Sequence, residues 1–343
     1  RNDYDVTNRV QVSSPAAVRS AVREVFRTLY PTSSFDAVWM AFHDFERFFE
    51  GREPHYHAVD TTYHDIQHTL DMTLALSRLI AGHEATVDAH DRLGPERTSL
   101  GLITALFHDS GYLRHRETDR DSVSGAEFTL SHVSRSAAFL TQYLPRIGLE
   151  DFTPVATQIV HFTGYEVDLD TIELDKPKDS IVGHLLGTAD LIAQLADRCY
   201  LEKCRDRLFP EFILGGIAIK EASVGTLVRY RSGRDLLAQT LKYYKHYARR
   251  RLEHNFNHAY RYIEPYFDGE NPYLVCIEKN LSYLGQILIS NDWDSLRRQP
   301  ACTTPDKHGE ARLMNLAMQH IRKLADSQKI TLKGGVARPV LGY

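Results

Sequence analysis

The residues best suited to chemistry in this chain of 343 residues and 17 histidines are histidines close to aspartates. His108 and Asp109 are adjacent, and Gly111 follows them. Neighbouring side chains on an α-helix point about 100° apart, so both can bind one metal ion only where a helix ends or is distorted. Gly111 offers such an end. The pair predicts a metal site at a helix C-terminus, although a His-Asp dipeptide is also compatible with an ordinary capped helix end.

A second pair of histidines lies upstream, at the start of another helical pattern. His64 and His68 are four residues apart, a spacing that places both side chains on one helix face. Both can bind the same metal ion, or one can bind the metal while the other faces a substrate. Two surface histidines at a helix start have the same spacing, so the pair leaves these interpretations open.

Further candidate ligands follow downstream. Asp190 lies among apolar residues in a helical pattern, and a buried carboxylate needs a metal or a partner charge such as a core arginine. The intervals between candidates each suit one helix and a connection, so several helices can converge on one point. In chain order the candidates are His68, His108, Asp109, His132, His161 and Asp190.

Four imidazoles and two carboxylates are suitable donors for two divalent ions, with Mn, Fe, Zn, Ni and Mg as the candidates. One carboxylate bridging the two ions would leave positions for water. A hydroxide about 2 Å from each ion would be a strong nucleophile at neutral pH. The set therefore predicts a dinuclear metal site and hydrolytic chemistry.

Helical periodicity covers most of the chain, and alternating strand patterns are almost absent, so we predict an all-α fold. Gly82 is expected to end the helix that carries His68. Residues 112–123 and 165–180 read as loops. Helices are expected over residues 15–30, 34–50, 65–81, 99–108, 128–143, 154–162, 180–200, 222–230, 235–266, 271–289 and 310–325.

Composition excludes several classes of protein. A formal net charge of −4 argues against a nucleic-acid polymer as partner. No apolar run of about 18 residues predicts a membrane span, and no signal-peptide pattern follows Arg1. Four cysteines without a CxxC pair suggest reduced thiols and a cytoplasmic location. Because the first residue is Arg rather than Met, we expect a processed or trimmed chain.

The order of the histidines and aspartates resembles that of the HD-domain metal-dependent phosphohydrolase superfamily. The segment Tyr63-His64-Asp65-x-x-His68-x-x-Asp71 is also similar to the Y-H-N-x-x-H-A-x-D-V signature of class I cyclic-nucleotide phosphodiesterases. His132 and His161 resemble the additional ligands of HD-GYP-type and diiron HD proteins. The resemblance implies an N-terminal helical segment (1–59), an HD metal-binding catalytic core (60–200) built as a helical bundle, additional C-terminal helices (201–325) and a tail (326–343).

The resemblance also implies roles for individual residues. His68, His108, Asp109 and Asp190 would hold the first metal. Asp109 would bridge to a second metal that His132 and His161 complete. His64 would be the general acid that protonates the leaving 3′ oxygen. Asp65 replaces the Asn of the signature and would either hold the neighbouring loop or raise the pKa of His64.

Two departures from the resembled families affect the substrate. No Gly-Tyr-Pro follows His161, which argues against cyclic di-nucleotide hydrolysis. Tyr112 stands where many HD proteins carry Lys or His, so a usual phosphate contact is missing or replaced. The residues that could contact a substrate instead are Tyr63, Asp65, Arg114, Arg116 and Arg135.

The expected activity is hydrolysis of 3′,5′-cyclic nucleotides to 5′-monophosphates by a metal-activated hydroxide, with His64 as the acid. Alternatives are a nucleotidase or triphosphohydrolase of the same fold, a diiron oxygenase, and a non-catalytic nucleotide sensor. The expected partner is a small nucleotide, with no nucleic-acid polymer and no membrane. Aromatic residues in 201–325 could stack on its base, form core, or make a homodimer contact.

Overall fold

The computed structural model describes residues 1–221 and 226–328, and it confirms the all-α prediction. The α-helices in the first part of the chain are α1 (Pro15–Leu29), α2 (Asp36–Phe49), α3 (Ile66–Thr86), α4 (Gly94–Phe107), α5 (His132–Arg146), α6 (Thr153–Ile159) and α7 (Pro177–Ala196). Those that follow are α8 (Tyr200–Lys203), α9 (Phe209–Leu214), α10 (Gly233–Tyr243), α11 (Ile263–Tyr266), α12 (Pro272–Ser290) and α13 (Gly309–Gln328).

Short turns of other helix types connect these elements. The 3-10 turns are η1 (Ser110–Tyr112), η2 (Gly125–Phe128), η3 (Glu150–Phe152), η4 (Val160–Thr163), η5 (Leu169–Thr171), η9 (Ala259–Tyr262) and η10 (Trp293–Ser295). The π-helical turns are η6 (Cys204–Leu208), η7 (Tyr244–Ala248) and η8 (Arg251–Asn255). One antiparallel hairpin, β1 (Ile219–Glu221) and β2 (Thr226–Val228), pairs Ile219 with Val228.

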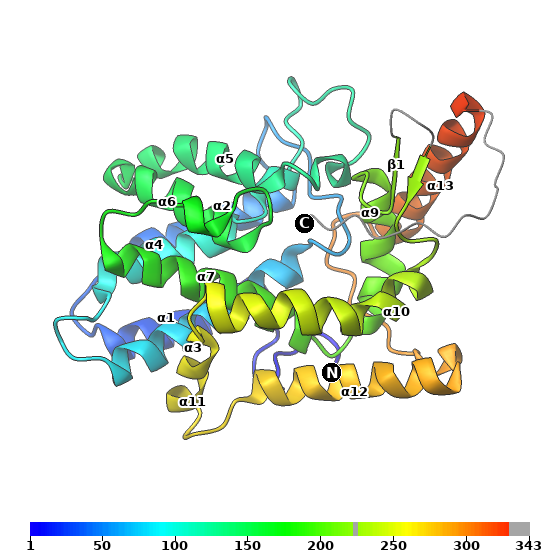
Figure 1. Ribbon diagram of the computed structural model, residues 1–343. Coiled ribbons are helices and arrows are strands. Elements are labelled where there is room, and N and C mark those ends of the chain that lie inside the picture. The colour runs from blue at the N-terminus through cyan, green and yellow to red at the C-terminus, as the bar shows by residue number, and fades with distance from the viewer. Residues whose placement is uncertain (222–225, 329–343) are drawn as a thin grey trace.

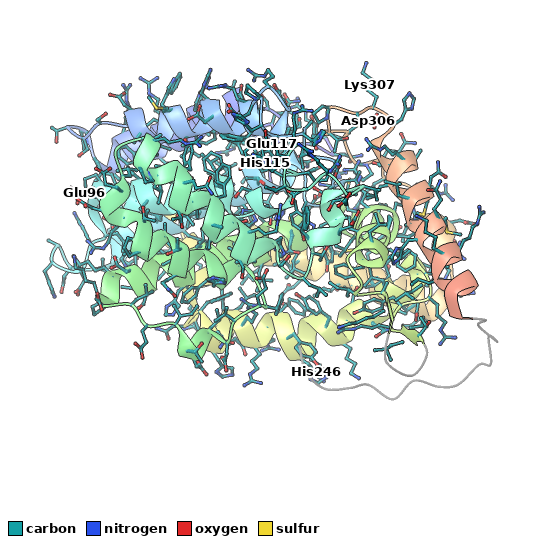
Figure 2. The ribbon with its side chains drawn as sticks, turned by 90° about the horizontal axis from the view of Figure 1, so that it is seen from above. Glu96, His115, Glu117, His246, Asp306 and Lys307 are labelled. Carbon is teal, nitrogen blue, oxygen red and sulfur yellow. The ribbon has the colours of Figure 1, made fainter. Side chains whose placement is uncertain are left out.

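Helix α3 is the centre of the fold. Every residue from Ile66 to Glu84 is buried, because helices pack on all of its sides rather than on one stripe. The helices α1, α4, α7 and α11 pack against it, while α9, α13 and β1 gather at the other end of the molecule (Figure 1). Charged side chains such as Glu96, Glu117 and Lys307 point outward from the surface (Figure 2). The start of α3 therefore lies where several buried helix ends can reach it.

The prediction that Gly82 ends this helix is wrong, since α3 continues to Thr86. The role of Gly82 is close packing: a Cβ at this position would lie 1.6 Å from the backbone oxygen of Tyr262. The glycine lets the η9–α11 segment approach the helix backbone. This contact joins distant parts of the chain and leaves no local signal in the sequence.

Gly82→Ala is expected to destabilise the protein by roughly 3 kcal/mol, because backbone must move to admit the methyl group. Urea unfolding followed by far-UV circular dichroism measures the change. The matched control is Gly285→Ala in α12, where a Cβ meets nothing within 4 Å. There the better helix propensity of alanine should leave stability unchanged or raise it. Equal stability of Gly82→Ala and the wild type would contradict the close packing.

Two helix predictions in the C-terminal half are wrong. Part of the expected helix 222–230 is strand β2, and its residues 222–225 lie outside the described residues. Short runs of alternating apolar and polar residues on both sides of residues 222–225 favour a β-hairpin over a helix. The single helix expected over 235–266 is interrupted by π-turns and by Asn257 and His258, whose φ angles of 48° and 57° cannot continue an α-helix.

Three further expectations concern the C-terminal tail, membrane spans and domain boundaries. Residues 326–328 of the expected tail continue α13, and residues 329–343 lie outside the described residues. In the described ranges, no helix has both the length and the apolar character needed to cross a bilayer. The division at residues 59 and 200 stays a prediction, although one hydrophobic core runs from Val12 to Ala317.

Candidate metal centre

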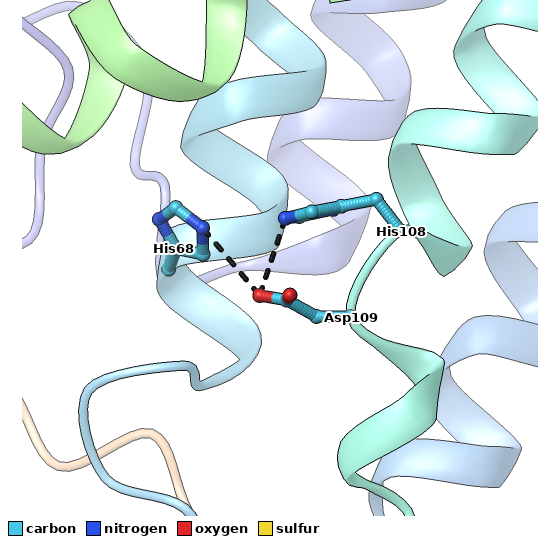
Figure 3. Close-up of side chains that lie close together, drawn as sticks. All are labelled: His68, His108 and Asp109. Atoms are coloured by element: carbon cyan, nitrogen blue, oxygen red, sulfur yellow. Dashed lines mark ion pairs between the residues drawn. The ribbon is translucent and has the colours of Figure 1, made fainter. Parts of the chain in front are cut away.

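Three buried side chains from two helices form a compact group of metal-binding atoms. His68 lies in the first turn of α3, while His108 and Asp109 follow the last residue of α4. One ligand atom from each lies within 4.8 Å of the others. The Nε2 atoms of His68 and His108 lie 3.5 Å and 3.2 Å from Asp109 Oδ2 (Figure 3). His108 and Asp109 can point at the same place because α4 ends at Phe107, before the pair and earlier than the predicted end at Gly111.

Gly111 acts through a close approach rather than through an unusual φ. A Cβ at this position would lie 1.8 Å from the backbone oxygen of His132, so glycine lets η1 pack against the first turn of α5. The Gly111 amide also donates to Ser136 Oγ at 2.8 Å. This packing brings His132 Nε2 to 3.8 Å from Asp109 Oδ1. Both oxygens of Asp109 therefore face imidazoles.

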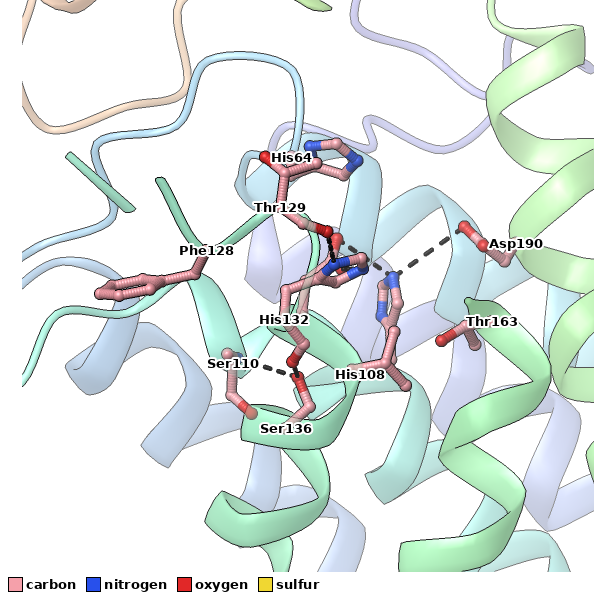
Figure 4. Close-up of polar contacts among 12 residues, drawn as sticks. His64, His108, Ser110, Phe128, Thr129, His132, Ser136, Thr163 and Asp190 are labelled. Atoms are coloured by element: carbon pink, nitrogen blue, oxygen red, sulfur yellow. Dashed lines mark hydrogen bonds and ion pairs between the residues drawn. The ribbon is translucent and has the colours of Figure 1, made fainter. Parts of the chain in front are cut away.

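Asp190 faces the same group from the middle of α7. Its Oδ1 atom lies 3.2 Å from His68 Nε2. The same atom lies 3.9 Å from His108 Nε2 (Figure 4). Donors bonded about 2.1 Å from one ion, at tetrahedral or octahedral angles, lie roughly 3.0–3.4 Å apart. The distances from His68 Nε2 to Asp109 and Asp190 and from His108 Nε2 to Asp109, 3.2–3.5 Å, are close to this spacing, whereas His108 Nε2 to Asp190 is longer at 3.9 Å. The group whose ligand atoms all lie within 4.8 Å of one another comprises His68, His108 and Asp109. Among the described residues, Asp190 forms ion pairs with these histidines and with no arginine, the alternative partner.

The hydrogen bonds of the histidines fix which nitrogen faces the carboxylates. Nδ1 lies 2.7 Å from the Ala105 carbonyl oxygen in His108 and 2.7 Å from that of Thr129 in His132. A carbonyl only accepts, so Nδ1 carries a proton and donates, and Nε2 points at Asp109. Backbone anchoring of this kind is typical of metal-binding histidines. Asp109 Oδ2 is itself buried without a hydrogen-bond partner, which also fits a metal ligand.

Without a metal, the cluster must balance its charges with protons. Burial lowers the pKa of His108, but the Asp109 and Asp190 carboxylates outweigh burial and raise this pKa to about 9. Burial acts to raise the pKa of Asp109, but the adjacent imidazoles hold it well below its ordinary value. For His132 burial dominates and lowers the pKa, in keeping with a neutral ring. A divalent ion bound here would supply the positive charge that the added proton on His108 supplies in its absence.

His161 is not joined to the other five predicted ligands by any recorded contact. It lies in η4, which packs against α7, and its Nδ1 atom is buried without a hydrogen-bond partner. Among the described residues, no hydrogen bond or ion pair links His161 to the cluster. Its place in a second metal site stays a prediction.

Sequence reasoning missed the residue that holds His64. Glu211 in α9 is fully buried, and its Oε2 atom lies 2.6 Å from His64 Nδ1. Its Oε1 atom accepts the amides of Thr62 and Tyr63 at 2.6 Å and 2.7 Å. Burial lowers the pKa of His64, but the Glu211 carboxylate outweighs it and raises the pKa. The sequence did contain a signal for Glu211, because this glutamate lies inside the apolar run of α9. The same kind of signal identified Asp190.

Asp65 takes the first of its two predicted roles, since it holds the loop and makes no recorded contact with His64. Its Oδ1 atom accepts the His68 amide at 3.0 Å and so caps the N-terminus of α3. Its Oδ2 atom lies 3.4 Å from Arg207 NH1 and accepts from the Thr303 hydroxyl. Arg207 also donates to the carbonyl of Thr62. Arg207 and Glu211, one helical turn apart, therefore hold the turn that precedes α3.

The residues predicted to contact a substrate make contacts within the protein. Tyr63 is buried, and its hydroxyl donates to Gln194 Oε1 at 3.1 Å. Arg114 pairs with Asp60 at 2.9 Å. Arg135 pairs with Asp119 at 2.8 Å and donates to the Gly111 carbonyl. Arg116 lies 3.3 Å from His57 Nδ1. These arginines shape the loop after η1, and their contact with a substrate stays a prediction.

Tyr112 has a defined place in the site. The centroid of its buried ring lies 4.6 Å from that of His64 and 4.6 Å from that of His132, at interplanar angles of 20° and 19°. Tyr112 thus contributes a buried aromatic contact to His64 and His132 rather than a charge. It packs against both imidazoles and so restricts the planes of their rings.

Comparison with protein-family models, with curated proteins and with solved structures found no match to this chain. The residues themselves therefore carry the argument for a function. What the geometry establishes is a buried His/Asp group with the spacing of metal ligands and, beside it, a histidine paired with a buried glutamate.

Proposed function

We propose that this protein is a metal-dependent phosphodiesterase of the HD-domain type that hydrolyses 3′,5′-cyclic nucleotides to 5′-monophosphates. The observation that carries the proposal is the His64–Glu211 pair beside the His/Asp cluster. The ring of His64 lies 5.9 Å from that of His68 and 6.0 Å from that of His132. A proton donor and a set of metal ligands thus share one site.

The residues that would hold divalent ions are His68, His108, Asp109 and Asp190, with Asp109 also reaching toward His132. When bound, such ions supply Lewis acidity toward phosphate oxygens and lower the pKa of water. The surrounding α3, α4 and α7 keep the carboxylates buried, so their charges act in a poorly screened environment.

His64 has the position and charge of a general acid. Glu211 accepts a hydrogen bond from Nδ1–H of His64, which keeps the ring in place. Its negative charge favours the protonated form of the imidazole. The Nε2–H is then available to protonate the leaving oxygen. An alkoxide leaves with difficulty unless it receives a proton in the transition state. The paired acid therefore supports a diester with an alkoxide leaving group over a substrate whose leaving group is a stable phosphate.

A substrate panel tests the proposal. The purified chain is incubated with Mn²⁺, Fe²⁺, Zn²⁺, Ni²⁺ or Mg²⁺ and offered cyclic AMP, cyclic GMP, a cyclic di-nucleotide, a mononucleotide and a nucleoside triphosphate. The expected result is metal-dependent release of a 5′-monophosphate from a cyclic mononucleotide. Turnover of the mononucleotide or triphosphate alone would replace the proposal by a nucleotidase or triphosphohydrolase. Oxygen consumption by the iron-loaded protein would replace it by an oxygenase.

Glu211→Gln is expected to slow hydrolysis of a cyclic nucleotide by about 10²–10³-fold. Glutamine can still accept the two backbone amides, but its NH₂ group would face His64 Nδ1 and disfavour the protonated ring. Metal content, measured by inductively coupled plasma mass spectrometry, should stay unchanged. Initial rates at saturating substrate give the effect on kcat.

The matched control is Glu202→Gln, which changes another buried glutamate that accepts the Arg298 amide outside the site. Its rate should stay within a few-fold of the wild type. If Glu202→Gln and Glu211→Gln lose activity equally, the loss reflects general destabilisation and the pairing with His64 has no catalytic role.

A further inference from the structure

A small cavity lies beside the candidate metal centre, between α3, the end of α7 and α8. Its volume is about 10 Å³, which admits one occupant the size of a water molecule. His68 borders both this cavity and the metal cluster. The side chains that line the cavity are Tyr63, Gln67, His68, Asp71, Ala193, Gln194, Asp197, Tyr200 and Lys203.

Two buried oxygen atoms of this cavity lack hydrogen-bond partners. Asp71 is 6% exposed and its Oδ1 atom accepts no hydrogen bond; Gln67, four residues earlier, is 2% exposed and its Oε1 atom accepts none. The i, i+4 spacing places both on one face of α3. Unsatisfied buried polar atoms are rare and need an explanation, such as an ion. Both atoms are acceptors, so an occupant must bring positive charge or a donated hydrogen.

The charges around the cavity leave Asp71 without a counter-ion of its own. Lys203 Nζ lies 2.6 Å from Asp197 Oδ2, and Arg78 NH2 lies 2.7 Å from Asp5 Oδ2. Arg78 also donates to the hydroxyl of Tyr273. Beside His68 and the tyrosines, the aspartates, lysine and arginine on and next to the lining are three carboxylates (Asp71, Asp197 and Asp5) and two cations (Lys203 and Arg78), and both cations are paired. When Asp71 is ionised, one negative charge is in excess, and it belongs to Asp71.

We propose that this cavity binds a single monovalent cation of the size of Na⁺ or K⁺ through Asp71 Oδ1 and Gln67 Oε1. One uncompensated carboxylate and a neutral amide match a single positive charge. Protein sites for divalent ions such as Ca²⁺ usually supply several carboxylates, and this cavity offers only one that is unpaired. The competing occupants are a proton on Asp71 and a water molecule. Burial, reinforced by Asp197 and Asp5, raises the pKa of Asp71 to about 8, so a proton is a real competitor at neutral pH.

Thermal unfolding of the full chain, loaded with a divalent metal, tests this proposal. The melting temperature is measured at pH 8.5 in equal concentrations of choline chloride, LiCl, NaCl and KCl. A cation bound only by the folded state stabilises it by mass action, so NaCl or KCl should raise the melting temperature by about 2 °C or more over choline chloride. Equal melting temperatures in all four salts would overturn the proposal and leave a water or a proton in the cavity.

Asp71→Asn should abolish the difference between salts while leaving the protein folded, because it removes the excess charge at nearly constant shape. Asp170→Asn, at an exposed position, should keep the difference. A salt response that persists in Asp71→Asn would place the ion elsewhere and overturn the proposal. Anomalous scattering from a crystal soaked in thallium(I) gives an independent readout: a peak next to Asp71 Oδ1 supports the site, and a peak only elsewhere contradicts it.

Discussion

Replacement of Asp109 by asparagine is expected to remove bound metal and hydrolytic activity together, with a fall in kcat/KM of about 10³-fold or more. Asp109 is the residue on which the cluster converges: Oδ2 faces His68 and His108, and Oδ1 faces His132. An asparagine amide lacks the negative charge with which Asp109 would bind a divalent cation. Metal content and initial rates on the same protein preparation measure both losses.

The control for this variant is Asp44→Asn, a half-buried aspartate that accepts a hydrogen bond from the Tyr143 hydroxyl far from the cluster in sequence. It should keep full metal content and activity. Retention of metal at wild-type stoichiometry by Asp109→Asn would mean that Asp109 is not a ligand. Retained metal with lost activity would restrict Asp109 to a role in catalysis.

Replacement of His64 by alanine should have the opposite signature, with metal retained and hydrolysis of cyclic nucleotides slowed by about 10²–10⁴-fold. His64 is held by Glu211 and makes no recorded ion pair with the two carboxylates of the cluster. An activated aryl phosphodiester should lose much less, because its leaving group needs no proton. The measurement is the ratio of kcat/KM values for the two substrates.

Equal losses on both substrates would refute the acid role of His64. His246→Ala removes an exposed histidine and should leave both rates unchanged. The double variant His64→Ala/Glu211→Gln adds a further check. If Glu211 acts through His64, the second change should add little, since residues that work as one unit are not additive.

The candidate site was more predictable than the helices that support it. Asp190 in an apolar helix and the His-Asp pair at a helix end carried signals in their immediate neighbours, and the structure brings them together with His68. Glu211 lies 147 positions from His64, so only the fold could pair them. Sequence pattern indicates that such a carboxylate needs a partner, but not which partner.

The errors in the fold have a common physical cause. Gly82 matches the local pattern of a helix end, yet a backbone contact with the distant Tyr262 decides its role. The run from 235 to 266 is helical in composition, yet Asn257 and His258 adopt left-handed φ angles that redirect the chain. In each case tertiary packing overrides a local preference that was weak by itself.

The most direct test of the account is anomalous diffraction at the absorption edge of whichever metal the purified protein retains. The account predicts a peak about 2.0–2.2 Å from His68 Nε2, His108 Nε2, Asp109 Oδ2 and Asp190 Oδ1. A folded protein that takes up no divalent ion, or a peak bound by other residues, would contradict it.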